Sequence, residues 1–208
     1  MLFLYLHGFA SGSRSSKALF LRERLAERGV KLTVPELDGG DFARLTVTKQ
    51  LQIIENVAGE QAVTLIGSSM GGYLAALYAG RHPSVKKLLL LAPAFEFLER
   101  WPRTLGPAVE AEWRRTEYMD VYHYGQKQQV RLHVGLLDDA AQYDAYPSFD
   151  QPALILHGKD DDVVPVANSE RYAAEHPNVR LEVVPGGHEM VGVLKEVWRR
   201  AESFLLPA

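Results

Sequence analysis

The feature that most restricts the fold of this chain is the pentapeptide Gly67–Gly71, which reads Gly-Ser-Ser-Met-Gly. It follows the apolar run Ala62–Ile66 and precedes Tyr73–Ala79, which is rich in helix-forming residues. A Gly-x-Ser-x-Gly sequence between a strand and a helix is the context of a nucleophile elbow, whereas a turn that only joins two elements is the alternative. Because the glycines remove side chains that would collide across a sharp turn, we expect Ser69 to project its hydroxyl at the start of a helix. Developing negative charge is favoured at that position.

Composition limits the classes of protein that need to be considered. The 208 residues are enough for a single domain with an inserted cap, and the net charge of −3 gives no indication of a nucleic-acid partner. No apolar run approaches the roughly 20 residues that a membrane span needs. Met1–Leu6 is too short and lacks the basic start of a signal peptide, and there is no cysteine. These features fit a cytoplasmic protein, and they leave a homo-oligomer open.

The chain alternates between apolar runs and amphipathic segments. Short runs without alternation are typical of strands buried on both faces of a parallel sheet, and the segments between them have the length of crossover helices. An α/β class with a mostly parallel sheet and helices on both faces is therefore expected. The expected strands are 2–6, 30–34, 62–66, 85–91, 152–158 and 179–184, and the expected helices are 18–28, 45–58, 73–80, 169–175 and 191–205.

The pattern changes between residues 95 and 150, where aromatic residues alternate with Arg and Glu. Segments 121–125 and 130–134 could pair as a hairpin about Gly125, and 138–146 could form a short helix. Because this stretch lies between two expected core strands, we interpret residues 95–150 as a cap inserted into one domain that spans 1–208. Its aromatic residues are candidates to line a substrate pocket, or alternatively to pack the cap onto the body. The candidates for substrate binding are Phe95, Trp101 and Trp113.

A serine hydroxyl becomes a good nucleophile only when a histidine removes its proton and a carboxylate orients that histidine. Of the seven histidines, His188 is best placed, because it follows the last expected strand in a Gly-rich turn. The acidic loop Asp160–Asp162 follows another strand end. Parallel strands bring such loops to one edge of the sheet, and the chain order Ser, Asp, His is that of one known triad arrangement. Spacing alone leaves Asp160, Asp161 and Asp162 open as the acid.

Such a mechanism also needs two backbone N–H groups that stabilise an oxyanion. One is expected from Met70, the residue after the nucleophile, and the other from Phe9 in the loop after the first strand. We expect the His7 imidazole to support that loop rather than to take part in the chemistry.

Four motifs together resemble the α/β-hydrolase superfamily. They are His7-Gly8-Phe9, Gly67-x-Ser69-x-Gly71-Gly72, His157-Gly158-x-x-Asp161-x-Val163-Val164-Pro165 and Gly187-His188. The first residues, with Ser11, Ser15 and Lys17-Ala18, are similar to those of the small YqiA-like esterases.

The resemblance implies a reduced α/β-hydrolase fold with about six strands. It also implies Ser69 as nucleophile, Asp161 as acid, His188 as base, and the Phe9 and Met70 N–H groups as the oxyanion hole. Since many members of the superfamily begin with an additional hairpin, the direct start at 2–6 is a difference.

The function expected from these residues is a serine hydrolase of the carboxylesterase or thioesterase kind, which acts on a small apolar ester or thioester. It needs no cofactor and no metal. A peptidase, a cofactor-free haloperoxidase or another acyl or C–C bond hydrolase could use the same triad. A protein that uses this fold only for binding is the alternative from a different class.

Overall fold

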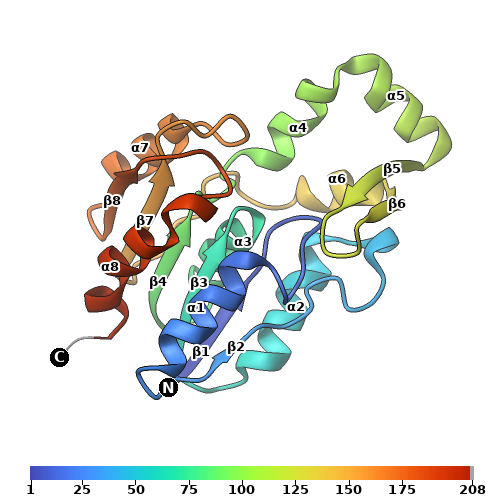
Figure 1. Ribbon diagram of the computed structural model, residues 1–208. Helices are drawn as coiled ribbons and strands as arrows, with labels where there is room; N and C mark the ends of the chain where they lie inside the picture. The colour runs from blue at the N-terminus through green and yellow to red at the C-terminus, as the bar shows by residue number, and fades with distance from the viewer. Residues whose placement is uncertain (207–208) are drawn as a thin grey trace.

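The structure is a computed structural model that describes residues 1–206 (Figure 1). Six strands form one sheet in the order β2-β1-β3-β4-β7-β8, and every neighbouring pair is parallel. The expected parallel sheet of about six strands is therefore confirmed. The strands of this sheet are β1 (Leu2–Leu6), β2 (Leu32–Thr33), β3 (Val63–Ser68), β4 (Val85–Leu91), β7 (Ala153–Gly158) and β8 (Val179–Val184). The helices between and after them are α1 (Ser16–Ala26), α2 (Val47–Ala58), α3 (Met70–Ala79), α7 (Val166–Glu175) and α8 (Leu194–Leu205), with short 3-10 helices η1 (Phe42–Arg44) and η2 (Val191–Val193).

Helices cover both faces of the sheet, as the near-continuous apolar character of its strands predicts. Along β1, Leu4 and Leu6 point into a core that they share with α2, α3 and α7. Phe3 and Tyr5 point the other way, into a core that they share with α1 and α8. Figure 1 shows α1 and α8 in front of the sheet and α2 and α3 behind it. None of the helices within residues 1–206 has both the length and the apolar character that crossing a bilayer requires.

Side chains at the helix starts explain where two of the helices begin. Ser15 caps α1 by accepting a hydrogen bond from the Ala18 N–H, and Thr46 caps α2 by accepting one from the Lys49 N–H. Thr48, two residues after this cap, bonds Asp139 of the insertion.

Several expected boundaries differ from the observed ones, most clearly in three places. The second strand has only two paired residues, Leu32–Thr33, rather than the five expected over 30–34. Because β2 is an edge strand with one neighbour, a short pairing is sufficient. The short helix expected over 138–146 is α6 (Gly135–Ala140), and the closing helix begins at Leu194 after the turn η2.

Residues 95–150 form an insertion between β4 and β7, with two helices, an antiparallel hairpin and a third helix. These are α4 (Phe97–Leu105), α5 (Pro107–Thr116), β5 (Tyr118–His123), β6 (Gln128–His133) and α6. The expected hairpin is present and begins three residues earlier than predicted. α4 and α5 extend away from the sheet as an arm, and the hairpin returns toward its edge (Figure 1).

The strand order locates the place where a ligand is expected. The chain runs from β1 outward to β2, and it then returns to the other side of β1 to form β3. In an open parallel sheet this reversal leaves a crevice beyond the carboxyl ends of the two strands. The loops that begin after Leu6 of β1 and Ser68 of β3 meet at that crevice.

Candidate active site

Ser69 lies at the crevice on a sharp turn between β3 and α3. Its φ of 54° and ψ of −121° are unusual for a residue with a side chain. The turn requires glycine on both sides, because a Cβ on Gly67 would lie 2.3 Å from the Gly71 carbonyl oxygen and one on Gly71 would lie 2.0 Å from the Leu6 carbonyl oxygen. The strand, turn and helix expected around Ser69 are therefore present, and its half-buried side chain opens into the crevice.

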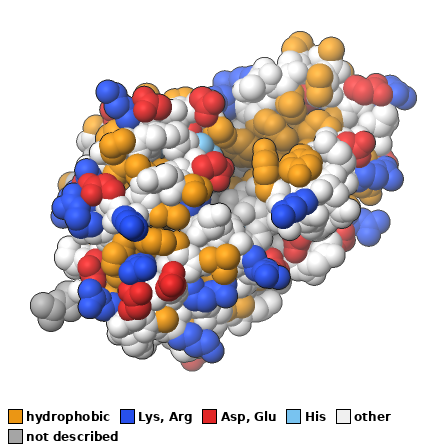
Figure 2. Space-filling model, in the orientation of Figure 1, with side chains coloured by type: hydrophobic (Ala, Val, Ile, Leu, Met, Phe, Trp, Pro, Cys, Tyr) orange, Lys and Arg blue, Asp and Glu red, His pale blue; other side chains and the backbone are white. Residues whose placement is uncertain are grey.

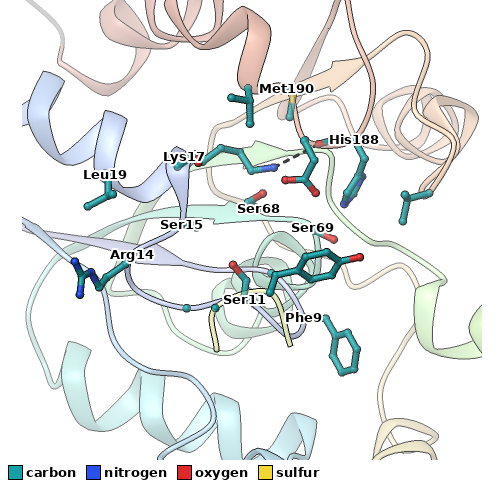
Figure 3. A pocket seen from close by; sticks show the side chains of 18 of the residues that line it. Phe9, Ser11, Arg14, Ser15, Lys17, Leu19, Ser68, Ser69, His188 and Met190 are labelled. Atoms are coloured by element: carbon teal, nitrogen blue, oxygen red, sulfur yellow. Dashed lines mark hydrogen bonds between the residues drawn. The ribbon is translucent and has the colours of Figure 1, made fainter. Parts of the chain in front are cut away.

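His188 faces the same crevice from the loop after β8, and its ring is bound to Asp161. The His188 Nδ1 lies 2.8 Å from the Asp161 Oδ2, and the Asp161 side chain is fully buried. Since an ionised carboxylate can only accept, this bond assigns the proton to Nδ1 and leaves Nε2 as the basic nitrogen. Figure 3 shows Ser69 and His188 on facing sides of one pocket. His188 with Asp161 can therefore accept a proton from a hydroxyl group, and the Asp161 carboxylate can stabilise the imidazolium that forms.

Asp161 accepts hydrogen bonds on both of its oxygens. Its Oδ1 accepts from the Val163 and Val164 N–H groups at 2.9 and 2.8 Å, and its Oδ2 also lies 3.1 Å from the His157 Nε2. Burial by itself would raise the pKa of the Asp161 carboxyl. The hydrogen bonds from His157, His188 and the Val164 N–H outweigh burial and hold that pKa well below its usual range. Asp161 is therefore the acidic residue of the 160–162 loop that contacts His188, while Asp160 and Asp162 are exposed.

His157, part of the His157-Gly158-x-x-Asp161 motif, belongs to the same network. Its ring is completely buried at the end of β7, and its Nδ1 lies 2.8 Å from the Ser169 hydroxyl of α7. Its Nε2 is 2.9 Å from the Val164 carbonyl oxygen, so Nε2 carries the proton and Nδ1 accepts from Ser169. The position of a histidine four residues before the acid, at a strand end, was the signal available in the sequence.

The loop after β1 approaches Ser69 directly. A Cβ on Gly8 would lie 3.4 Å from the Ser69 Cβ, so the backbone leading to Phe9 lies beside the nucleophile. Among residues 1–206, neither the Phe9 N–H nor the Met70 N–H has a hydrogen-bond acceptor. Two donors in this position are suited to a developing oxyanion.

The His7 imidazole supports this loop from inside the protein. Its Nε2 accepts from the Leu37 N–H at 3.2 Å, and its Nδ1 lies 3.0 Å from the Gly8 carbonyl oxygen. Burial lowers the pKa of His7 and favours the neutral ring that this pattern needs. The hairpin of the insertion touches the same loop, because the Gly125 N–H donates to the Ala10 carbonyl at 3.4 Å.

Aromatic side chains form one wall of the crevice, and of the three candidates expected from the sequence only Trp101 belongs to it. Phe9 packs edge-on against Trp101 with ring centroids 5.1 Å apart, and Trp101 stacks on Phe97 at 5.5 Å. Phe9 and Phe97 line the crevice, and Trp101 lies behind them. Figure 2 shows hydrophobic side chains gathered around the hollow between the arm and the body.

The structure places Phe95 and Trp113 in the core and not in the crevice. Phe95 is 1% exposed and stacks on Tyr172 of α7 at 4.3 Å. Trp113 is also 1% exposed, and its Nε1 donates to the Leu132 carbonyl of β6. Both side chains therefore pack the insertion together or onto the body, which was the alternative interpretation, and Phe97 is the lining residue that was missed.

The crevice is large and has a polar side opposite the aromatic wall. Its volume of about 1580 Å³ exceeds the roughly 300–1,000 Å³ of a typical small-molecule pocket. The polar side comes from the loop after β1 and the first turn of α1; its residues include Ser11, Ser13, Arg14, Ser15 and Lys17. No cluster of three or more metal-binding side chains occurs in the described part of the chain.

Comparisons with solved structures agree with this architecture. α/β-Hydrolase domain-containing protein 10 from mouse is 21% identical, with a TM-score of 0.82, over 98% of this chain and 88% of that chain. Est1E from Butyrivibrio proteoclasticus is 24% identical, with a TM-score of 0.80, over 98% of this chain and 86% of its own. A protein from Agrobacterium vitis S4 is 23% identical, with a TM-score of 0.78, over 96% of this chain and 87% of its own.

The resemblance proposed from the sequence motifs is therefore confirmed at the level of fold. A model of an uncharacterised protein family, UPF0227, matches residues 2–205, which is nearly the whole chain. The three solved structures align with 96–98% of this chain at TM-scores of 0.78 to 0.82, so they share its fold. The chain thus belongs to the UPF0227 family and has the α/β-hydrolase fold.

Proposed function

We propose that this protein is a serine hydrolase that cleaves a carboxylic ester or thioester through an acyl-enzyme on Ser69. The observation that carries the proposal is the bond between His188 and the buried carboxylate of Asp161, beside a serine on a positive-φ turn. This arrangement supplies a nucleophile, a base with a defined tautomer and a charge that steadies the protonated base.

In the first half of the reaction, the Ser69 hydroxyl attacks the ester carbonyl while the His188 Nε2 accepts its proton. The negative charge moves to the carbonyl oxygen, where the Phe9 and Met70 N–H groups donate hydrogen bonds. His188 then gives the proton to the leaving alcohol or thiol, and the carbon–oxygen or carbon–sulfur bond breaks.

In the second half, water attacks the acyl-enzyme and His188 accepts a proton from it. Collapse of the second tetrahedral intermediate releases the carboxylic acid and returns the proton to Ser69. Asp161 remains ionised throughout, because its Oδ1 accepts hydrogen bonds from the Val163 and Val164 N–H groups and its Oδ2 accepts one from His188.

We assign the apolar part of the substrate to the wall made by Phe9 and Phe97 with Trp101 behind it. Residues 95–150 then act as a cap, because α4 supplies Phe97 and Trp101 while the hairpin contacts the loop of Phe9. A peptidase would use the same triad, and only a substrate panel separates the two classes.

The test is labelling with a fluorophosphonate, which reacts with activated serines and needs no knowledge of the substrate. We expect stoichiometric modification that peptide mapping assigns to Ser69, loss of labelling in Ser69→Ala, and a labelling rate at least about 100-fold lower in His188→Ala. Ser68→Ala is the matched control, because Ser68 is adjacent but belongs to β3, and it should still label. A folded wild type that does not label would contradict the proposal and favour the binding-protein alternative.

A further inference from the structure

Lys17 is a buried cation whose position the proposed reaction does not explain. It is the second residue of α1, yet only 7% of its surface is exposed, and its side chain lines the crevice. Lysine is almost never buried to this extent unless it is paired. The first turn of a helix is also an unfavourable place for a positive charge, because the helix dipole is positive there.

The protein provides little to satisfy this ammonium group. Its Nζ donates to the His188 carbonyl oxygen at a long 3.4 Å, which Figure 3 shows as a dashed line. An ammonium has three donors, and the structure shows no second acceptor for Nζ within residues 1–206. The nearby acids Asp161 and Glu189 stabilise the charge at longer range, but neither forms an ion pair with Lys17 in the described part of the chain.

The start of α1 places further hydrogen-bond donors beside the same crevice. Ser15 and Ser16, at the N-terminal end of α1, line the same crevice, and the backbone N–H groups of residues 16 and 17 have no acceptor among the described residues. Burial lowers the pKa of Lys17, and a bound anion would oppose that effect. A buried ammonium with unused donors, beside a helix N-terminus, is the arrangement that binds an anionic group.

We infer that Lys17 binds an anionic group of the substrate, a carboxylate or a phosphate, and so selects esters that carry a negative charge close to the scissile carbonyl. Lys17 contacts His188 and lines the same crevice as Ser69, so the anion lies on the polar side of the crevice while the apolar part lies against Phe97. This inference deepens the proposed function and rests on it for the position of the scissile bond.

The experiment compares matched pairs of charged and neutral esters. Mono-4-nitrophenyl glutarate against 4-nitrophenyl valerate places the charge on the acyl side, and 4-carboxyphenyl valerate against phenyl valerate places it on the leaving group. For each pair, the charged-to-neutral ratio of kcat/KM in wild type is divided by the same ratio in Lys17→Met. We expect a quotient of about 10 to 100 in at least one pair, which corresponds to a charge-assisted hydrogen bond.

Dividing the ratios separates recognition from positioning. If Lys17 only holds the His188 loop, charged and neutral esters lose activity equally and the quotient stays near one in both pairs, which would overturn the inference. Arg14→Met is the matched control, because Arg14 is an exposed cation at the rim of the same crevice. Its quotient should be below about 3 and should approach one in 0.5 M salt, since exposed charges are screened.

Two further measurements keep the inference testable if Lys17→Met does not fold or if no ester is hydrolysed. The wild type alone should prefer a charged ester at least about fivefold over its neutral partner, and a preference for the neutral ester in both pairs contradicts the inference. Calorimetric titration of Ser69→Ala with glutarate, 4-hydroxybenzoate and inorganic phosphate tests anion binding without catalysis. Binding of one of the three supports the site and distinguishes carboxylate from phosphate, whereas binding of none overturns it.

Discussion

The parallel sheet and the insertion contribute to the same crevice by different physical means. The sheet places its groups through the backbone: Ser69, Asp161 and His188 follow β3, β7 and β8, and parallel pairing brings those strand ends together. The insertion places its groups through side-chain packing, as in the chain of rings from Phe9 to Trp101 to Trp113. Backbone placement can be inferred from the order of motifs, but side-chain packing depends on how each ring fits against its neighbours.

The difference has a consequence for mutation. Substituting a residue that the sheet positions should change the rate of the chemical step strongly and the choice of substrate weakly. Substituting a residue of the insertion should change the choice of substrate strongly and the chemical step weakly. The following predictions test that contrast, beginning with the largest effect.

Ser69→Ala should lower kcat/KM for a 4-nitrophenyl ester by at least about 10⁴-fold, because the covalent route is lost. The melting temperature should fall by no more than a few degrees, since the turn is held by its flanking glycines. Ester hydrolysis at fixed pH and thermal unfolding followed by circular dichroism provide the two measurements. Retention of more than about 1% of the activity would show that Ser69 is not the nucleophile.

Asp161→Asn should lower kcat/KM by about 10²- to 10⁴-fold, because an amide neither fixes the same His188 tautomer nor steadies its charge. The neighbouring variants Asp160→Asn and Asp162→Asn are matched controls, since both side chains are exposed. They should stay within about threefold of wild type. The assignment of Asp161 is wrong if either neighbour causes the greater loss.

The same carboxylate predicts a pH dependence of stability. The pKa of Asp161 is held below its usual range in the folded protein, whereas in the unfolded chain it is about 3.9. The stabilisation is therefore complete above about pH 5 and is lost as pH falls through the unfolded and then the folded pKa. Urea unfolding at pH 7, 4 and 3 should show wild type about 1–3 kcal/mol more stable than Asp161→Asn at pH 7, with little change at pH 4 and a clearly smaller difference at pH 3. An exposed control, Asp162→Asn, should not show this convergence with wild type.

In the insertion, Phe97→Ala should raise KM for apolar esters by about tenfold and leave kcat within about threefold, because Phe97 lines the crevice without contacting the triad. Trp113→Phe is the contrasting variant, since Trp113 is buried and donates to the Leu132 carbonyl. It should destabilise the protein by about 1–2 kcal/mol and leave KM nearly unchanged. Steady-state kinetics with a series of acyl chain lengths and urea unfolding measure the two effects, and an equal change of KM in both would remove the distinction.

Much of the body could be predicted from the sequence, because local pattern and global topology agree there. Each expected strand of the sheet is present, and the residues expected at the nucleophile turn adopt the backbone that the glycines permit. The choice of Asp161 over Asp160 and Asp162 as the acid came only from the resemblance. The three residues are of one type, and the sequence does not show in which direction each side chain points. The structure distinguishes them because the Val163 and Val164 N–H groups orient the Asp161 carboxylate toward His188.

The residues that sequence reasoning missed are those whose roles depend on three-dimensional neighbours. Phe95 and Phe97 are two positions apart in an aromatic stretch, but α4 begins at Phe97. The Phe95 ring packs in the core, whereas Phe97 lines the crevice. His157 resembles any histidine at a strand end until Ser169 of α7 is placed beside it. Lys17 is the second residue of a helix, and its burial beside the His188 loop depends on an element 171 positions away in the chain.

The backbone conformation of Ser69 also makes the folded chain less stable than the same fold could be. A φ of 54° with ψ of −121° costs on the order of 1–3 kcal/mol for a residue with a side chain, against a total stability of about 5–15 kcal/mol for a typical domain. The surroundings maintain it, because the Ser69 N–H donates to the Leu91 carbonyl and the Ser69 carbonyl accepts from the Ala94 N–H. Relief of that cost by Ser69→Gly should give an inactive protein that is about 1 kcal/mol more stable than wild type. Selection for stability alone would therefore drive this position away from serine.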